Sequence, residues 1–223
     1  MMKLIRLYTA ENAQRILDAA RELELKDGRE TAKGYAKNIK NNLQAGSSNP
    51  KAAPLLAQIQ KNLYDDARFR FLTFPKLILS LRFAHYPAGG KYDWHFDNAH
   101  MDARRADLSF TLFLNDDYEG GELEMDFGHF KSRVKGKAGE IVIYDTGVRH
   151  RVNPVTKGER WCLVGWVHSL IPLPADRRIV QLLGEEMQAV RKARASAAED
   201  QEGEDGPSAL HEIYQYLCRR FSG

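Results

Sequence analysis

The chain has 223 residues and a formal net charge of +3 at pH 7, from 33 Lys or Arg and 30 Asp or Glu residues. This even balance does not indicate a nucleic-acid or polyanion binder, and 43% hydrophobic against 28% charged residues is typical of a globular rather than a disordered chain. Two cysteines, Cys162 and Cys218, exclude a disulfide scaffold and a cysteine-rich zinc module and favour a reducing compartment.

The length corresponds to roughly one and a half domains of average size, enough for a core that needs neither disulfides nor a metal to fold. The first residues, MMKLIRLYTAENAQ, contain no apolar segment of signal-peptide length. No segment approaches the ~18 consecutive apolar residues of a membrane span. We therefore expect a cytoplasmic protein with one main domain and additional elements around it.

The first third of the chain has helical spacing. Thr9 is a candidate N-cap, and apolar residues follow at intervals of three and four, at Ala13, Ile16, Leu17, Ala20 and Leu23. A basic stretch without acids runs from residue 31 to Lys51 and is interpreted as a solvated loop with a short helix. A second amphipathic helix is predicted after Asn49-Pro50, with Leu55, Leu56, Ile59 and Leu63 on one face. Residues 1–75 are therefore expected to form a helical part that packs on the core.

From residue 76 the pattern changes to short apolar or alternating segments separated by Gly, Asp, Asn and Lys. These segments are KLILSLRFAHY, RADLSFTLFLN, GGELEMDFG, AGEIVIYD and ERWCLVGWVHSL. No long helical segment separates them, which argues against parallel βαβ units. The spacing predicts an antiparallel sandwich or jelly roll over residues 76–172. The expected fold class is mainly β with flanking helices.

After Pro172 and Pro174 helical spacing returns, with an apolar stripe of Ile179, Leu182, Leu183, Met187 and Val190. Residues 196–207, SAAEDQEGEDGP, are small and acidic and are interpreted as a flexible linker. A last helix is predicted over 208–221. Residues 173–223 are thus expected to be a C-terminal helical extension, whose helices pack on this chain or across a homo-oligomer interface.

The segment around residue 95 carries the strongest chemical signal. His95 and Asp97 are two residues apart, and on an extended strand that spacing directs both side chains to one face. An imidazole and a carboxylate side by side are two of the three ligands of a facial triad for non-haem iron(II). Taken alone, this pair agrees equally well with two polar residues on the protein surface.

Three further features favour the metal site. His150 follows an apolar strand 53 residues after Asp97, about where a jelly roll winds back on itself. Arg160 opens the next strand, and Cys162, Val164 and Trp166 share its face, which forms an apolar pocket with one guanidinium. A guanidinium binds the distal carboxylate of a dicarboxylate in bidentate fashion. Tyr86 is a candidate donor to the same carboxylate.

Further candidates lie near these residues in the sequence. Tyr92, three residues before His95, is a second candidate to contact a cosubstrate. Candidate substrate contacts are Asn98, His100, Arg104 and Trp166. The sequence agrees equally well with the alternative that the first three lie in an exposed polar loop and that Trp166 belongs to the core. His168 shares the strand face of Arg160 and is a weaker candidate for the pocket.

With these residues in place, the sequence resembles the iron(II)/2-oxoglutarate-dependent dioxygenases of the prolyl 4-hydroxylase superfamily, and in particular the bacterial PKHD-type (PiuC-like) hydroxylases. The segments that carry the resemblance are DGRETA, KNIKNNLQ, HFDNA, LSFTLFLNDDYEGGEL and IVIYDTGVRHRVNPVTKGER. The resemblance implies a double-stranded β-helix (jelly-roll, cupin-like) core. It also implies iron(II) bound by His95, Asp97 and His150, and 2-oxoglutarate bound by Arg160.

The implied reaction consumes O₂, converts 2-oxoglutarate to succinate and CO₂, and hydroxylates a C–H bond, with ascorbate as a supporting reductant. The carboxylate of Asp97 argues for hydroxylation, since halogenating relatives carry a small residue there. The substrate is a protein residue, such as a prolyl residue, or a small metabolite, and nothing in the sequence chooses between them. The loop FGHFKSRVKGK at 127–137 departs from the family pattern, which bears on the substrate more than on the chemistry.

Two other hypotheses remain. A non-catalytic jelly-roll sensor would bind metal and 2-oxoglutarate without turnover. Oxidative repair of nucleic acid is disfavoured, because the related dealkylating oxygenases carry a second arginine six residues after the first, where this chain has Trp166. The low net charge also argues against nucleic acid as a partner.

Overall fold

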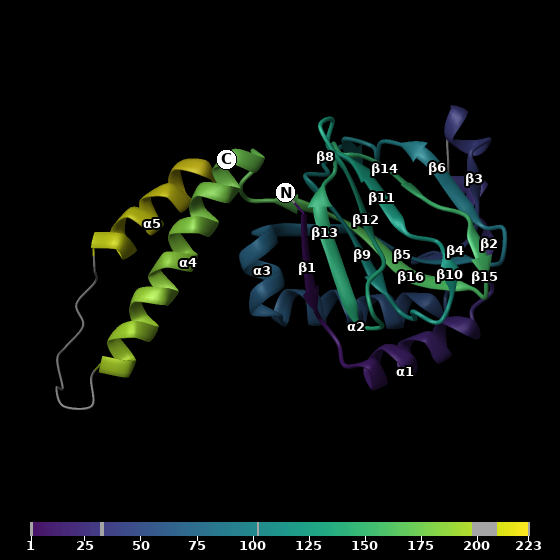
Figure 1. Ribbon diagram of the computed structural model, residues 1–223, viewed down its shortest axis with the longest axis horizontal. Helices are drawn as coiled ribbons and strands as arrows, with labels where there is room; N and C mark the ends of the chain where they lie inside the picture. Colours follow the sequence, from purple (N-terminus) through teal and green to yellow (C-terminus); the bar gives the residue numbers. More distant parts are fainter. Residues whose placement is uncertain (1, 32–33, 102, 198–208, 223) are drawn as a thin grey trace.

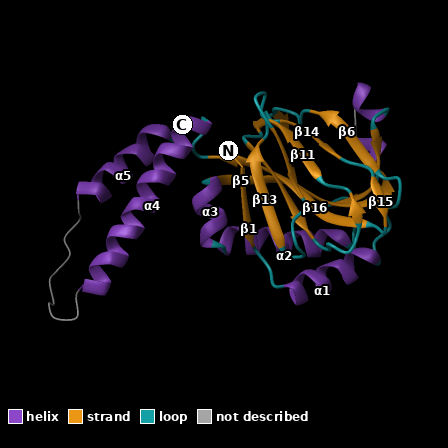
Figure 2. Ribbon diagram, viewed as in Figure 1, coloured by secondary structure: helices purple, strands orange, loops and turns teal. Residues whose placement is uncertain are grey.

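The computed structural model describes residues 2–31, 34–101, 103–197 and 209–222. In this part of the chain two antiparallel sheets lie against each other, and helices cover one of them (Figures 1 and 2). The larger sheet has seven strands, in the order β1 (Met2–Arg6), β13 (Glu140–Asp145), β9 (Leu108–Phe113), β16 (Arg160–Ser169), β5 (Pro75–Tyr86), β4 (Leu43–Gly46) and β2 (Lys26–Asp27).

The smaller sheet has five strands and carries the sequence motif around His95. Its order is β12 (Lys131–Val134), β11 (Leu123–Asp126), β14 (Arg149–Val152), β6 (Lys91–His95) and β3 (Lys40–Asn41). Two further strand pairs are β10 (Glu119–Gly120) with β15 (Val155–Lys157), and β7 (His100–Met101) with β8 (Arg104–Arg105). This arrangement is the predicted jelly roll.

Helices α1 (Ala10–Arg21), α2 (Ala52–Asp65) and α3 (Ala67–Thr73) cover the outer face of the larger sheet (Figure 2). The Thr9 side chain caps α1 by accepting a hydrogen bond from the backbone N–H of Asn12 at 3.2 Å, as predicted. Asp66 caps α3 in the same way by accepting from the backbone N–H groups of Arg68 and Phe69. Two short 3₁₀ helices, η1 (Gly28–Thr31) and η2 (Gly34–Lys37), precede β3.

Two separate hydrophobic cores result from this layering. One lies between the helices and the larger sheet, and includes Leu17, Ile59, Phe69, Phe83, Phe110 and Leu163. The other lies between the sheets, and includes Phe113, Leu123, Met125, Val142, Val152 and Cys162. The first core packs without residues from the space between the sheets. The cavity described below lies in the second core.

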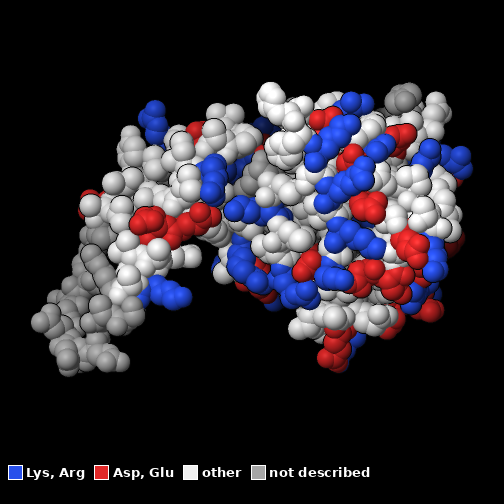
Figure 3. Space-filling model, in the orientation of Figure 1, with Lys and Arg blue, Asp and Glu red and all other residues white. Residues whose placement is uncertain are grey.

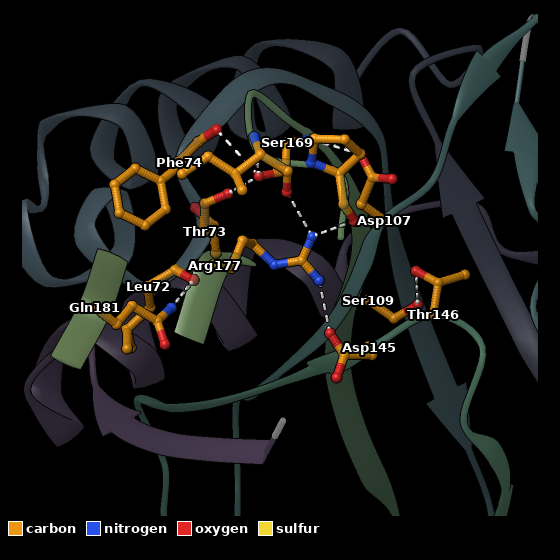
Figure 4. A network of polar contacts seen from close by, with 12 residues as sticks. Leu72, Thr73, Phe74, Asp107, Ser109, Asp145, Thr146, Ser169, Arg177 and Gln181 are labelled. Atoms are coloured by element: carbon orange, nitrogen blue, oxygen red, sulfur yellow. Dashed lines mark hydrogen bonds and ion pairs between the residues drawn. The ribbon is translucent and has the colours of Figure 1, made fainter. Parts of the chain in front are cut away.

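Helices α4 (Pro174–Ala197) and α5 (Ala209–Phe221) form a hairpin that projects away from the sheets (Figure 1). A buried polar network joins its base to the core, and Figure 4 shows it from close by. Arg177 donates to the Asp145 carboxylate at 2.7 Å and to the carbonyl oxygens of Ile171 and Pro172 at 2.7 Å each. One turn further, Gln181 donates to the carbonyl of Leu72 at 2.8 Å.

The structure differs from the sequence expectations at two places. Residues 1–75 are not only helical, because β1, β2, β3 and β4 join the two sheets. The apolar stripe predicted on α4 is only partly covered, since Leu183, Met187 and Val190 are partly buried while Ile179 and Leu182 are about half exposed, and Arg177, Val180 and Gln181 are buried. The predicted linker at 196–207 lies outside the described residues, apart from its first two residues, which end α4.

None of the described helices combines the length and the apolar character that a membrane crossing requires.

Candidate metal centre and cosubstrate pocket

The smaller sheet brings His95 and His150 together. His95 ends β6, His150 lies in β14, and the two residues are paired directly across the strands. The register then shifts, so that Val152 pairs with Tyr92, three residues before His95. This bulge points both Tyr92 and His95 into the space between the sheets, which strict alternation along a strand would not do. Asp97 follows just beyond the end of β6.

His95, Asp97 and His150 form a cluster that could hold a metal ion. One potential ligand atom of each residue lies within 4.8 Å of the other two. The Asp97 carboxylate lies between the imidazoles, with Oδ1 3.8 Å from His95 Nε2 and Oδ2 3.7 Å from His150 Nε2. Two imidazoles and one carboxylate on one side of a space are the donor set of a non-haem iron(II) facial triad, so these residues fit that metal.

Both imidazoles are oriented by backbone carbonyl groups. Nδ1 of His95 donates to the carbonyl oxygen of Asp93 at 2.7 Å, and Nδ1 of His150 donates to that of Val148 at 2.9 Å. With the proton held on Nδ1, the lone pair of Nε2 is directed toward the other ligands. The Tyr92 ring also stacks on that of His95, with 3.5 Å between the ring centroids.

Two side chains from the larger sheet hold the Asp97 carboxylate. Ser109 Oγ and Trp166 Nε1 both donate to Oδ2, at 2.8 and 2.9 Å. Thr146 Oγ1 lies 3.0 Å from Ser109 Oγ and completes the chain of hydrogen bonds. Trp166, predicted as a substrate contact, is therefore a partner of the metal-ligating carboxylate.

Burial and neighbouring charges set the protonation of the cluster. Burial lowers the pKa of His95 to about 4, and the nearby His150 adds to this effect. Burial alone would raise the pKa of Asp97, but the charges of His150 and His95 oppose it. Hydrogen bonds from Ser109 and Trp166 oppose it as well, so the pKa of Asp97 lies below the ordinary range of an aspartate. At neutral pH His95 is thus neutral and Asp97 ionised, as metal binding requires.

Arg160 is 1% exposed and lines the same cavity as the three metal-ligating residues. Its guanidinium lies against the rings of Tyr86 and Phe113, 5.0 and 5.5 Å from their centroids, and donates to Cys162 Sγ at 2.9 Å. Among the described residues no carboxylate pairs with it, and its Nε has no hydrogen-bond partner. A buried charge in this state is costly, so the cavity favours an anion such as a cosubstrate carboxylate.

A glycine makes room for this arginine. Gly121 has a φ of +65°, which favours glycine, and a Cβ at this position would lie 3.2 Å from Cδ of Arg160. The Gly120-Gly121 pair, interpreted from the sequence as a turn or bulge, lies at a register shift between β10 and β15.

The cavity between the sheets has a volume of about 220 Å³. Of the candidates from the sequence, Tyr86, Tyr92, Asn98 and Trp166 line it together with Arg160 and the triad. His100 and Arg104 do not, because they lie on the exposed β7–β8 hairpin. His168 also lies outside the cavity lining, and its Nδ1 is 3.1 Å from the carbonyl oxygen of Arg105.

The sequence interpretation missed other residues of this cavity. They are Ser109, Thr111 and Tyr144 on the central strands, and Lys40, Gln44 and Arg82 near the edge. Ser109, Thr111 and Tyr144 lie in apolar segments. Alternation along these segments shows which side chains share a face of the strand, but it does not show that this face lines a cavity. Lys40, Gln44 and Arg82 lie on strands that pair with distant segments of the chain, and only this pairing brings them to the cavity.

Comparison with known proteins agrees with this geometry. The 2OG-Fe(II) oxygenase superfamily matches residues 81–168. A PKHD-type hydroxylase from Picosynechococcus is 41% identical over 180 residues, which cover 80% of this chain and 82% of the relative. The chain belongs to the PKHD-type hydroxylase family of the 2OG-Fe(II) oxygenase superfamily. The PKHD-type hydroxylase PiuC of Pseudomonas aeruginosa is 31% identical over 226 residues, which cover 97% of this chain and 96% of PiuC.

Solved structures agree on the fold. A prolyl-4-hydroxylase from Pseudomonas putida has a TM-score of 0.57 at 24% identity and covers 75% of this chain and 92% of its own. HygX from Streptomyces hygroscopicus, solved with nickel and 2-oxoglutarate, has a TM-score of 0.58 at 12% identity and covers 75% of this chain and 82% of its own. As a member of this superfamily, the PKHD-type hydroxylase is an oxidoreductase that uses iron(II), 2-oxoglutarate and O₂.

Proposed function

We propose that this PKHD-type hydroxylase hydroxylates an unactivated C–H bond of a protein residue or a small metabolite, with conversion of 2-oxoglutarate to succinate and CO₂. His95, Asp97 and His150 would bind the iron(II), and Arg160 would bind the distal carboxylate of 2-oxoglutarate. The observation that carries this proposal is a buried guanidinium without a carboxylate partner among the described residues, in one cavity with a His-Asp-His cluster.

When bound, iron(II) supplies the redox chemistry that couples decarboxylation of 2-oxoglutarate to oxidation of a C–H bond. The protein supplies binding and orientation. The carbonyl groups of Asp93 and Val148 fix the two imidazoles, and Arg160 fixes one end of the cosubstrate. The buried rings of Tyr86 and Phe113 enclose the guanidinium and exclude water from it, which strengthens its attraction for a carboxylate.

The test is the turnover of 2-oxoglutarate to succinate by purified protein with iron(II), ascorbate and O₂. Turnover is expected to require iron(II) and to disappear in His95→Ala and Asp97→Ala. His129→Ala is the matched control, because His129 is exposed in a loop outside the cavity, and it is expected to leave turnover unchanged. Failure of the wild-type protein to consume 2-oxoglutarate, with or without added lysate, would refute the proposal.

The non-catalytic sensor is the alternative. It predicts binding of metal and 2-oxoglutarate without succinate formation, so the same assay decides between the two. Action on nucleic acid is not favoured, because Trp166 occupies the position of a second arginine and is engaged with Asp97. On the face shown in Figure 3, basic and acidic side chains are interspersed rather than gathered into one basic surface.

The substrate itself is best sought by mass spectrometry of lysate incubated with enzyme, iron(II) and 2-oxoglutarate, as products that gain one oxygen atom. A lysate from cells that lack the protein is the best source, because its substrate is not already hydroxylated. The cytoplasmic location and self-association through the C-terminal helices stay predictions.

A further inference from the structure

Arg177 joins the C-terminal hairpin to the end of a central strand of the larger sheet. It is 1% exposed, and its guanidinium donates to the Asp145 carboxylate at 2.7 Å. Asp145 is the last residue of β13, and Thr146 follows it directly. Thr146 is 2% exposed, and its Oγ1 lies 3.0 Å from Oγ of Ser109 (Figure 4). Two consecutive residues therefore connect an arginine of α4 to a serine of β9.

Ser109 connects this corner to the metal-ligating carboxylate. A serine has one hydroxyl proton, and Ser109 donates it to Oδ2 of Asp97 at 2.8 Å. Its Oγ is therefore the acceptor in the contact with Thr146, so Thr146 is the donor. A hydroxyl that accepts one hydrogen bond donates more strongly in another, because the two bonds polarise each other. Thr146 thus strengthens and directs the hydrogen bond that holds Asp97.

Strand pairing supports the same connection. Ser109 lies in β9, where it pairs with Tyr144 of β13, the residue before Asp145. On its other side Ser109 pairs with Trp166 of β16, which supplies the second hydrogen bond to Asp97 Oδ2, at 2.9 Å. The end of β13 is thus connected to the donors of Asp97 both by backbone pairing and by the side chain of the residue that follows it.

The ion pair at the base of α4 holds the corner in place. The Asp145 side chain is 14% exposed. Removal of one partner from such a pair leaves the other charge less compensated, and that charge then moves toward water or another partner. A movement of Asp145 displaces Thr146, since the two residues share a peptide bond. The hydrogen bond from Thr146 to Ser109 weakens steeply when its distance and angle change.

A second contact at the base of α4 leads elsewhere. Gln181 is buried one turn further along the helix and donates to the carbonyl oxygen of Leu72 in α3 at 2.8 Å. Arg177 and Gln181 therefore both attach the hairpin to the core, but the ion pair of Arg177 leads to β13, whereas the hydrogen bond of Gln181 leads to α3 (Figure 4). Comparison of the two residues separates attachment of the hairpin from support of the metal centre.

We propose that Arg177 is a positioning residue for the metal-ligating carboxylate of Asp97, acting through Asp145, Thr146 and Ser109. The inference rests on the proposed function, in which Asp97 binds the metal, and adds a role for the C-terminal hairpin. None of the described residues of α4 and α5 lines the metal cavity, so this role is indirect. Coupling between two sites is reciprocal: docking of α4 raises the affinity for metal, and bound metal tightens the base of α4.

The first test measures the affinity of the full-length apoprotein for iron(II) by calorimetry under argon. Arg177→Met and Thr146→Val are each expected to lower this affinity about threefold or more. Thr146→Ser keeps the hydroxyl group and is expected to retain the wild-type affinity. Gln181→Met is the matched control, because it removes a buried contact of α4 that does not lead to β13, and it is expected to leave the affinity unchanged.

A second set of variants tests the path itself. Ser109→Ala removes the hydroxyl group through which Thr146 reaches Asp97. In the Ser109→Ala background, Arg177→Met and Thr146→Val are therefore expected to cause no further loss of iron(II) affinity. A general loosening of the protein would lower the affinity by the same factor with and without Ser109.

The reverse effect is measured at the hairpin. Saturating iron(II) under argon is expected to slow hydrogen exchange of the backbone amides of residues 177–182 in the wild-type protein. The same addition of iron(II) to Thr146→Val, at saturation, is expected to leave their exchange unchanged. This comparison does not depend on activity.

Each outcome decides the proposal. Wild-type iron(II) affinity in Arg177→Met and Thr146→Val overturns it, and so does an equal loss in Gln181→Met, or an undiminished loss in the Ser109→Ala background. If Arg177→Met does not fold, Arg177→Lys replaces it, and Thr146→Val decides the connection to Asp97. If the wild-type protein binds no iron(II), the proposed function fails first, and that result is read separately from the comparison of variants.

Discussion

Asp97 uses its two carboxylate oxygens unequally. Oδ2 accepts hydrogen bonds from both Ser109 and Trp166, whereas Oδ1 lies 3.8 Å from His95 Nε2 and accepts no hydrogen bond from the described residues. An oxygen that already accepts two hydrogen bonds is a weaker metal ligand than one that accepts none. The larger sheet therefore holds the carboxylate in one orientation and would leave Oδ1 available to a metal ion.

Loss of these donors is expected to weaken metal binding without unfolding the protein. Ser109→Ala and Trp166→Phe should each lower iron(II) affinity about 10- to 100-fold, which is the range for partners of metal ligands. Titration of the apoprotein with iron(II) under argon measures this directly. Trp94→Phe is the matched control, because Trp94 contacts Lys131, Arg149 and Arg151 instead of Asp97. Equal loss in the control would show that the effect is not specific to Asp97.

Two arginines of equal burial differ in their partners. Arg160 and Arg177 are both 1% exposed, but Arg177 pairs with Asp145 at 2.7 Å, and Arg160 has no carboxylate partner among the described residues. Removal of one partner from a buried ion pair leaves an uncompensated charge and lowers stability, whereas removal of a buried charge that has no carboxylate partner relieves a cost that only a bound ligand would offset. The same substitution should therefore have opposite effects at the two positions.

Arg160→Met is expected to raise the free energy of unfolding of the apoprotein by about 1 kcal/mol, because it removes an unpaired buried charge. It should also abolish the stabilisation that 2-oxoglutarate gives to the iron(II)-loaded wild-type protein. Urea unfolding of the apoprotein, and thermal unfolding under argon with and without 2-oxoglutarate, measure the two effects. A variant that is still stabilised by 2-oxoglutarate would show that Arg160 does not bind it.

At the scale of elements, the base of α4 depends on polar contacts. Arg177 and Gln181 donate to carbonyl groups of Ile171 and Leu72, which would otherwise be buried without partners. These contacts turn Arg177 and Gln181 inward, while Ile179 and Leu182 of the apolar stripe stay about half exposed. The carbonyl groups of the segment before α4 and of α3 require hydrogen-bond donors, so the face of α4 that carries these donors turns inward.

Arg177→Met is accordingly expected to lower the free energy of unfolding by about 2–4 kcal/mol, because Asp145 and two carbonyl groups lose their donor. Urea unfolding measures the loss. Arg178→Met is the control, since Arg178 is exposed and pairs only with Glu185 on the same helix. A loss of similar size in both variants would refute a special role for the buried network.

The sequence predicted the elements that carry a strong periodic signal. Strands β5, β9, β13 and β16 are apolar, and helices α1, α2 and α5 are amphipathic or capped, so their types follow from local pattern. Strand β6, with the sequence KYDWH, is absent from the segments predicted by alternation because its bulge breaks that pattern, although His95 and Asp97 were interpreted as lying on an extended strand. The short strands β3 and β4 depend on pairing with distant segments, and no local pattern shows that pairing.

The sequence likewise predicted some residues of the candidate site and missed others. His95, Asp97, His150 and Arg160 lie in recognisable spacing and do meet in one cavity. Lys40 and Arg82 could not be found, because an isolated Lys or Arg in the sequence is most often a solvated side chain. Only the pairing of β3 with β6, and of β5 with β16, brings these two side chains together.

At the scale of the whole molecule, we expect the fold to be independent of the metal. Both hydrophobic cores are built from apolar side chains, and the three metal-ligating residues already have protein partners that orient them. Chelation of the metal is therefore expected to leave the far-UV circular dichroism unchanged. It should lower the free energy of unfolding only by the amount that metal binding contributes. Loss of secondary structure on chelation would contradict this.

The order of strands in the larger sheet also has a consequence for how the chain folds. The middle strand, β16, lies between β9 and β5, yet it is the last of the seven to be synthesised. Until residues 160–169 leave the ribosome, the edges of β5 and β9 that pair with β16 carry unpaired backbone N–H and C=O groups. Folding that waits for such distant pairings is slow and exposes the chain to aggregation. Because β16 also carries Arg160 and Trp166, addition of this strand both closes the sheet and completes the lining of the cavity.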